Sequence, residues 1–326
     1  MGSPDTSDTL STGSGESSLS LKTWEPWEDI ARRELCEDIT KTPKRVSRFR
    51  KRVRKLESKT FKPNLEESFL AAFLRANMFD EDKAFDSYRR FFRLRTIEPE
   101  TYYPFNRGSL SYKDVLDHNL AFVLSKKNPL DGTTLIVVTF QYLALTRFRD
   151  FKQLYTPTAL QILMLLRSPE IQVRGFRFIA DLKCFSLGYL RHVPISLAKV
   201  CGESSSGAMP IRLLGIHLVN EPSWYQLLLK MVTPFLDSED SITQVHGSDL
   251  SSLHRIVHPS ALPKELGGRT GSILADNSIR TEFFRRNNDV QYDSTLGHIP
   301  PRKSERHLPS QQKRNVKRRS KDGSKG

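Results

Sequence analysis

The sequence has few cysteines, no long apolar run and no secretory signal. Its three cysteines, Cys36, Cys184 and Cys201, are too few and too scattered for a disulfide framework or a zinc site, which fits a reducing compartment. The longest apolar run, residues 135–145, is too short to span a bilayer and is interrupted by Gln141. The N-terminus is polar and acidic, whereas a secretory signal is basic and then apolar. These absences predict a soluble, cytoplasmic protein.

Motifs that carry catalysis are also missing. The sequence contains no Walker A loop and no Gly-x-Gly-x-x-Gly after a predicted strand, and residues 202–207 have the wrong spacing for a nucleophile elbow. The histidines of the second half lie on separate predicted elements, and we interpret His246, which precedes a glycine, as structural. Asp181, at the end of an apolar run, is the best acid candidate, and we expect it to accept hydrogen bonds from the following loop. The sequence thus contains no convincing catalytic constellation and no metal-ligand spacing.

The formal charge of +14 is concentrated in two blocks. Residues 41–59 contain ten basic residues against Glu57, and residues 302–326 contain ten against Glu305 and Asp322, so the rest of the chain is acidic overall. Blocks of this kind attract polyanions, either anionic membranes or nucleic acid. Because arginine-rich stretches without interleaved aromatic residues are a weak nucleic-acid signal, we favour a membrane. Two alternatives stay open: a solvated helix face for the first block, and a solubilising or nuclear-import-like tail for the second.

The first third of the chain predicts a small all-helical bundle. Residues 1–23 are rich in Ser, Thr, Gly and Asp and should be disordered, and Gly2 formally matches a myristoylation signal that Pro4 and Asp5 make unattractive. From residue 24 to 97 apolar side chains recur at helical spacing. The inward positions are Val46, Phe49, Val53 and Leu56, then the run 65–74, then Ala84, Phe85, Tyr88, Phe91 and Phe92. Residues 98–117 have little pattern and predict a linker.

Residues 118–268 predict an α/β domain. Two apolar runs, 121–125 and 134–139, flank a turn signal at 128–132 and indicate a hairpin. Helical and strand-like segments then alternate, which is typical of a mostly parallel sheet with helical cover. The predicted elements are a helix at 151–166, a strand at 176–182, a helix at 187–200, a strand at 216–219, a helix at 222–235, a strand at 244–246 and a helix at 248–257. Residues 269–326 lose this periodicity and predict a basic, disordered tail.

The helix that begins at Pro222 is unusually apolar. Proline suits the first helical turn, because the N–H that it lacks would have no partner there. The residues with the spacing of one buried face are Trp224, Leu227, Leu228, Met231, Val232 and Phe235. Tyr225 and Leu229 widen that face. Such a helix is either fully buried in an ordinary α/β domain, or it faces a core on one side and a ligand or bilayer on the other.

A series of short strings between residues 65 and 268 is specific in combination. They are Phe73-Leu74-Arg75-Ala76 with Phe79-Asp80 and Ala84, Phe178-Ile179-Ala180-Asp181-Leu182, Pro210-Ile211-Arg212, residues 215–222, Pro234-Phe235-Leu236, His246-Gly247-Ser248-Asp249, Leu262-Pro263 and Leu266-Gly267-Gly268. Together, in order and with few gaps, they resemble the CRAL-TRIO lipid-binding family. The branch that looks most similar contains α-tocopherol transfer protein, cellular retinaldehyde-binding protein and the clavesins.

The resemblance implies a CRAL-TRIO domain with a mobile lid helix. Such a domain holds one hydrophobic molecule (tocopherol, retinaldehyde, a phospholipid or a sterol relative) in a cavity between the sheet and the lid, carries it between membranes, and is not an enzyme. By position, the cavity walls would be Tyr155, Thr158, Ile162, Phe176, Phe178 and Ala180, and the lid residues Trp224, Tyr225, Leu228, Leu229, Val232 and Phe235. We expect no cofactor besides the bound lipid, and a monomer that associates reversibly with anionic membranes such as those of endosomes.

Two departures from the family pattern affect these expectations. The family binds a phosphoinositide head group beside the lid through basic residues; Arg212 fits one such position, whereas Leu214 and the acidic loop 237–240 replace others. A polar, Ser/Gly-rich stretch at 201–207 stands where the family continues an apolar helix. We assign head-group or membrane contact to a wider set: Arg212, Arg48, Arg52, Lys55, Arg318 and Arg319. The alternative function is a non-transferring regulatory or scaffold module with a degenerate pocket that recruits protein partners.

Overall fold

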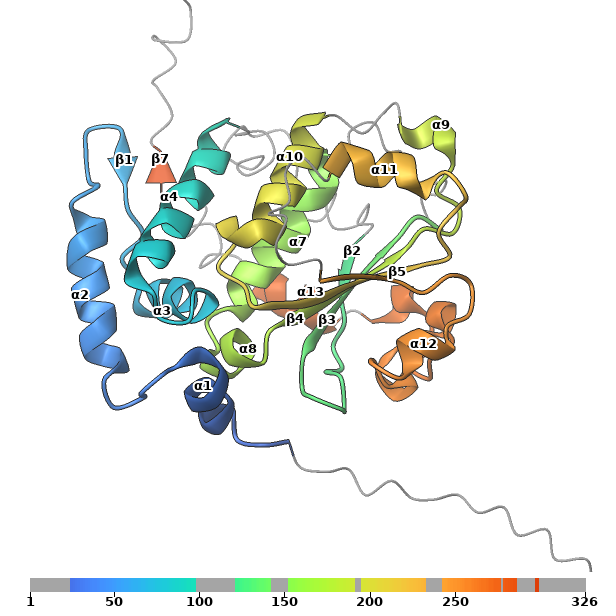
Figure 1. Ribbon diagram of the computed structural model, residues 1–326, viewed down its shortest axis with the longest axis horizontal. Coiled ribbons are helices and arrows are strands. Elements are labelled where there is room, and N and C mark those ends of the chain that lie inside the picture. The colour runs from blue at the N-terminus through green and yellow to red at the C-terminus, as the bar shows by residue number, and fades with distance from the viewer. Residues whose placement is uncertain are drawn as a thin grey trace, which may run out of the picture.

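The computed structural model describes residues 24–97, 121–141, 152–190, 195–232, 242–276, 278–285 and 297–298. Within these ranges a helical bundle packs beside a five-stranded sheet that is covered on both faces (Figure 1). The predictions for residues 1–23, for the linker at 98–117 and for the tail at 302–326 lie outside the described residues.

The N-terminal bundle has an aromatic core of its own. Its helices are α1 (Trp27–Leu35), α2 (Thr42–Arg54), α3 (Glu67–Ala76) and α4 (Glu81–Ile97). Val46, Phe49 and Val53 of α2 are buried against α3 and α4, as their spacing predicts. Phe73 of α3 and Tyr88 of α4 meet with ring centroids 5.2 Å apart. Pairs of this kind contribute about 0.5–1.5 kcal/mol beyond the burial of their surface.

Arg75 of α3 joins the bundle to the sheet domain. Its guanidinium donates hydrogen bonds of 2.8 and 2.7 Å to the Glu37 carboxylate and one of 2.6 Å to Oε1 of Gln172. Gln172 lies in α8 (Pro169–Arg174) and donates in turn to two backbone carbonyls. Glu37 and Arg75 are both buried, so the pair depends on this complete set of hydrogen bonds. One of the strings that resembles the family thus has a structural role.

The sheet has the order β2-β3-β4-β5-β6. A hairpin of β2 (Ala121–Val123) and β3 (Thr134–Thr139) forms its antiparallel edge, as predicted. The strands β4 (Phe176–Asp181), β5 (Leu213–Val219) and β6 (Thr243–Val245) continue from β3 in parallel. The helices of this part are α7 (Lys152–Leu165), α8, α9 (Leu187–Leu190), α10 (Ile195–Glu203), α11 (Tyr225–Val232) and α12 (Ser251–His254). The predicted α/β class with a mostly parallel sheet and helical cover is confirmed.

The two faces of the sheet are covered by different elements. Phe176 of β4 packs with Ile162 of α7 on one face, whereas Ile179 packs with Val219 and with Leu253 of α12 on the other. Figure 1 shows α7, α10 and α11 together on one side of the strands and α12 on the other. The core therefore consists of two apolar layers separated by the sheet.

The segment after residue 247 differs from its prediction. The helix expected at 248–257 is the single turn α12, and short 3-10 turns follow at Pro259–Ala261, Lys264–Leu266 and Ile273–Ala275. A disordered tail from residue 269 is also wrong for the part described, since α13 (Ser278–Arg285) is helical and β7 (Gly297–His298) pairs with β1 (Phe61–Lys62). Ile273 anchors this segment with 1 % of its surface exposed, and its N–H donates to the Glu265 carboxylate at 3.1 Å.

Candidate functional site

The face of the sheet beneath α7 brings together most of the predicted cavity residues that the structure describes. Phe176, Phe178 and Ala180 alternate with residues of the opposite face along β4, so their side chains share one side. Ile162 of α7 belongs to the same apolar cluster as Phe176 and Phe178. Thr158 is buried, and its hydroxyl oxygen has no hydrogen-bond partner among the described residues. Tyr155 lies on α7, but its side chain is outside the description.

Packing above the middle of this face is incomplete. Phe178 and Ala180 of β4 and the neighbouring Ile216 of β5 are half-buried, although their strands are central and helices cover the face. Protein interiors are normally packed as densely as organic crystals, so an apolar side chain at such a position is normally buried. Phe176, at the start of the same strand, shows this ordinary behaviour and is fully buried. The remaining access at Phe178, Ala180 and Ile216 indicates space between the sheet and its helical cover.

An aromatic cluster lies at the start of the predicted lid helix. Trp224, directly before α11, has its ring centroid 5.4 Å from that of Phe185. The ring centroid of Phe185 lies 4.3 Å from that of Phe140 and 6.1 Å from that of Tyr189 on α9, with the Phe185 and Tyr189 rings nearly parallel. Phe140 directly follows β3, Phe185 lies in the loop after β4, and Trp224 lies between β5 and α11. They give the N-terminal end of α11 a fixed apolar anchor.

The segment predicted as a lid is helical, but its faces differ from the prediction. Helix α11 spans Tyr225–Val232, beside α10. Leu227, which we expected on the buried face, is 47 % exposed, and the neighbouring Gln226 and Lys230 are exposed too. The spacing of apolar residues predicts which of them share a helical face, but it does not identify what that face contacts. The prediction that Leu227 is buried is therefore wrong. Tyr225 is half-buried; the side chains of Leu228, Leu229 and Val232, and the whole of Phe235, lie outside the description.

The two ends of the lid segment are held together at its base. The N–H of Asn220, after β5, donates to the carbonyl of Gly247, after β6, at 2.8 Å. The N–H of Gly247 donates back to the Glu221 carboxylate at 3.1 Å. Asn220 has a φ of 52°, a left-handed conformation that asparagine tolerates better than most residues. These bonds tie the chain that precedes α11 to the chain that follows β6.

Asp181 has the hydrogen-bonding role that its position predicts. The buried carboxylate accepts from Nδ2 of Asn220 at 2.8 Å, from the N–H of Lys183 at 3.1 Å and from Nε2 of Gln141 at 2.5 Å. These partners follow β5, β4 and β3, whose carboxyl ends meet at this edge. Asp181 thus joins the segments that follow these three strands.

Two histidines predicted to lie on separate elements meet on the face of the sheet that α12 covers. Nδ1 of His217, on β5, lies 3.0 Å from Nε2 of His246, and Nδ1 of His246 lies 2.8 Å from the Ser252 hydroxyl. The Ser252 hydroxyl also lies 3.4 Å from the Asp249 carbonyl, to which it can donate. Burial lowers the pKa of His217 to about 4, with repulsion from Arg177 and His246 added. The chain of bonds links β5 to β6 as a structural element, which supports the structural interpretation of His246.

The polar stretch at 201–207 forms a contact with the bundle. Helix α10 passes into a π-helical turn, η3 (Ser204–Ala208), which ends at Gly207 with a φ of 90°. Arg90 of α4 donates to the carbonyl of Ser206 at 2.7 Å, and the hydroxyl of Ser87 donates to the carbonyl of Gly207. The backbone carbonyls of this stretch therefore join the C-terminal end of α10 to α4.

The predicted head-group residue Arg212 is engaged within the protein. It donates to the carbonyl of Val173 at 2.7 Å and forms an ion pair with Glu34 of α1. Hydrogen bonds from Arg33 and from Arg212 hold the pKa of Glu34 below its usual value. Arg33, Glu34 and Arg212 line a surface cavity of about 210 Å³. Its other lining residues include Trp24, Ile30, Leu130, Arg174 and Leu214. An anionic head group would have to displace Glu34 to reach Arg212.

The predicted contacts on α2 have two different environments. Arg48 donates to the Glu81 carboxylate at 2.7 Å, and Arg52 donates to Asp82 at 2.6 Å while its guanidinium covers the ring of Phe85. Lys55 is exposed. Arg318 and Arg319 lie outside the described residues.

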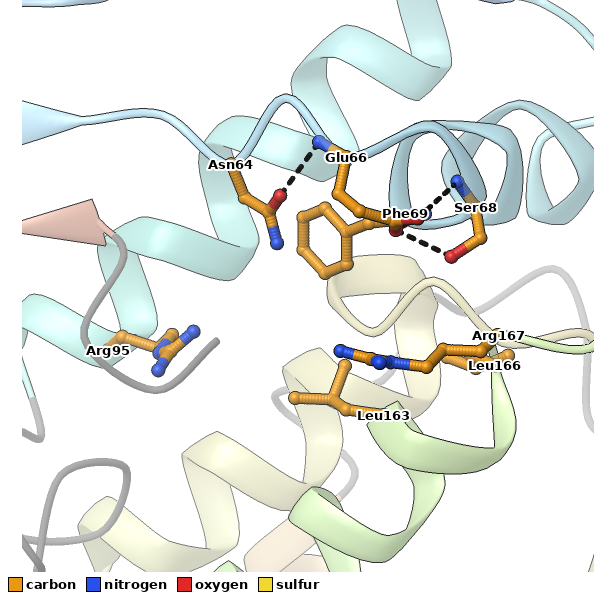
Figure 2. A pocket seen from close by; sticks show the side chains of 8 residues that line it. All are labelled: Asn64, Glu66, Ser68, Phe69, Arg95, Leu163, Leu166 and Arg167. Carbon is orange, nitrogen blue, oxygen red and sulfur yellow. Dashed lines mark hydrogen bonds between the residues drawn. The ribbon is translucent and has the colours of Figure 1, made fainter. Parts of the chain in front are cut away.

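A second hollow, between the bundle and α7, is too small for a lipid. Arg95 and Arg167 reach toward it from opposite sides, with the side chains of Asn64, Phe69 and Leu163 completing its wall (Figure 2). Its volume of about 10 Å³ is about the least that one water molecule needs.

Comparison with known proteins identifies the family. The CRAL/TRIO domain family matches residues 121–268. The human protein "Alpha-tocopherol transfer protein-like" is 32 % identical over 249 residues, which cover 74 % of this chain and 70 % of that protein. This chain belongs to the CRAL/TRIO family.

Two clavesins and one solved structure also match. Clavesin-1 of Rattus norvegicus is 28 % identical over 205 residues, which cover 62 % of this chain. The aligned part spans 57 % of clavesin-1, less than two thirds of its length. Human clavesin-2 is 25 % identical over 252 residues, or 76 % of each chain. The crystal structure of Sfh5 aligns with 78 % of this chain and 99 % of its own at a TM-score of 0.43 and 9 % identity.

Two structural features are absent from the described part of this CRAL/TRIO protein. No helix there is both long and apolar enough to cross a membrane. The same residues contain no group of three or more His, Cys, Asp or Glu side chains that could hold a metal ion.

Proposed function

We propose that this CRAL/TRIO protein binds one hydrophobic ligand between the sheet and helices α7, α10 and α11, and transfers it between membranes without catalysing a reaction. The observation that carries the proposal is the access left at Phe178, Ala180 and Ile216 in the middle of a covered sheet. Family membership supports lipid binding. Tyr155 and Thr158 of α7 would complete the wall opposite the strands.

The energetics favour a closed apolar cavity. Each buried CH₂ contributes about 0.8 kcal/mol, so a lipid with roughly 20 carbons gains about 16 kcal/mol on leaving water. A bilayer offers the same gain, so a carrier can exchange its ligand only where the cavity opens at a membrane surface. Helix α11 is suited to open there, because it exposes Leu227 outward while Trp224 anchors its first turn. Leu228, Leu229, Val232 and Phe235 are the lid residues proposed to face the ligand.

We further propose that the protein is a cytoplasmic monomer that docks reversibly on anionic membranes. The concentrated positive charge of residues 41–59 and 302–326 supports this proposal. Because Arg212 forms an ion pair with Glu34, we attribute the attraction to anionic membranes to these two blocks and not to a head-group site beside the lid.

Native mass spectrometry of the purified full chain, after incubation with a lipid extract, tests the binding proposal. We expect one adduct of lipid mass per chain. A folded protein that takes up no lipid would contradict a carrier and favour the regulatory or scaffold module.

A further inference from the structure

The basic residues of α2 fall into two groups with different roles. The arginines turn toward the bundle: Arg45 donates to the carbonyl of Phe79, Arg50 donates to that of Leu65, and Arg48 and Arg52 pair with the start of α4. These arginines hold α2 against its neighbours. Their charge is partly compensated by Glu81, Asp82 and Glu67.

The lysines of the same segment point outward. Lys44, Lys51 and Lys55 are exposed, and among the described residues none of them has an ion-pair partner. Their spacing of seven and then four residues places them on one helical face, in a row of about 16 Å. Arg54 is exposed beside this row. We call Lys44, Lys51 and Lys55 the lysine row.

The lysine row is remote from the lid. Figure 1 places α2 at the left margin of the molecule and α11 toward the opposite side, with α4, α7 and α10 between them. A surface that binds α2 therefore need not touch the lid.

We propose that the lysine row is an electrostatic docking surface for an anionic bilayer, and that it acts independently of the ligand cavity. The proposal deepens the proposed membrane docking and does not rest on lipid uptake. Lysine is a compact, hydrated point charge suited to diffuse attraction by a charged leaflet, whereas arginine is the usual residue for phosphate and nucleic-acid recognition. Four of the five arginines of α2 bind groups of the protein, whereas the lysines of the row face solvent, with Arg54 exposed beside them. No exposed aromatic residue accompanies the row for stacking on bases.

Sedimentation of the full chain with vesicles tests the proposal. The vesicles contain phosphatidylcholine alone or phosphatidylcholine with about 30 % phosphatidylserine, at about 0.1 M salt. The variant is Lys44→Gln/Lys51→Gln/Lys55→Gln, and the matched control Arg255→Gln/Lys264→Gln/Arg269→Gln removes the same exposed charge elsewhere. Each cation near an anionic leaflet contributes about fivefold in affinity, the equivalent of about 1 kcal/mol, so the lysine variant should lose about 100-fold.

The outcomes separate the alternatives. We expect the control to bind phosphatidylserine vesicles as the parent does, and lipid uptake in native mass spectrometry to be unchanged in both variants. Unchanged vesicle binding by the lysine variant, or an equal loss in the control, would overturn the proposal. A lysine variant that loses binding to duplex DNA but not to vesicles would overturn it in favour of nucleic acid.

Discussion

The buried side chain of His217 predicts how the stability of the protein depends on pH. His217 is fully buried and has its pKa lowered to about 4, whereas a histidine in the unfolded chain titrates near 6.5. As the pH falls, the unfolded chain binds its proton first, so the stabilising contribution is complete above pH 6.5 and is lost as the pH falls toward 4. With these two values the free energy of unfolding should fall by about 2 kcal/mol between pH 7.5 and pH 5.0 through His217 alone.

Urea denaturation of the full chain at several pH values measures this dependence. The informative comparison is with His217→Asn, whose amide nitrogen can still donate to His246 but does not titrate. We expect the variant to be less stable at pH 7.5 and to have a shallower loss toward pH 5.0, by about 2 kcal/mol. Because His246, whose pKa burial also lowers, remains in the variant, some dependence should persist. Parallel pH profiles for parent and variant would refute the reasoning.

Two further predictions follow from single contacts. Glu37→Gln leaves the buried Arg75 charge uncompensated and should lower the free energy of unfolding by about 3–5 kcal/mol. Glu67→Gln, in an exposed ion pair, should lower it by less than about 1 kcal/mol. Urea denaturation measures both values, and equal losses would contradict the role assigned to the Glu37–Arg75 pair. Leu227→Glu should leave stability within about 0.5 kcal/mol but slow the transfer of a fluorescent lipid between vesicles, because it places a charge on the outer face of α11. Leu274→Glu, at a side chain of similar exposure away from the lid, is its control, and an equal effect on transfer would show that Leu227 has no special part.

The predictions that were confirmed rest on local patterns. The turn at 128–132 fixed the β2–β3 hairpin, and alternation along β4 correctly placed Phe176, Phe178 and Ala180 on one face. Such patterns are expressed within one element, so they can be recognised without knowing its neighbours.

The differences concern partners far apart in the chain. Pairing of β7 with β1 joins residues more than 230 positions apart, and nothing near residue 297 indicates a strand. Arg212 was assigned to a head-group contact because it fits a position of the family pattern; its partner Glu34, 178 residues earlier, could not be recognised from the sequence. The contact of His217 with His246 arises because β5 and β6 are neighbours in the sheet. The charge and spacing of residues indicate which kind of partner a side chain requires, whereas the tertiary structure determines which residue is that partner.

Filling the proposed cavity tests the central claim most directly. Ala180 is half-buried on the face that lines the space above β4, and Ala275 is exposed in a 3-10 turn elsewhere. Native mass spectrometry after incubation with a lipid extract should show one lipid adduct for the parent chain and for Ala275→Phe, and none for a folded Ala180→Phe. Lipid uptake by Ala180→Phe equal to that of the parent would contradict a ligand site on this face of the sheet.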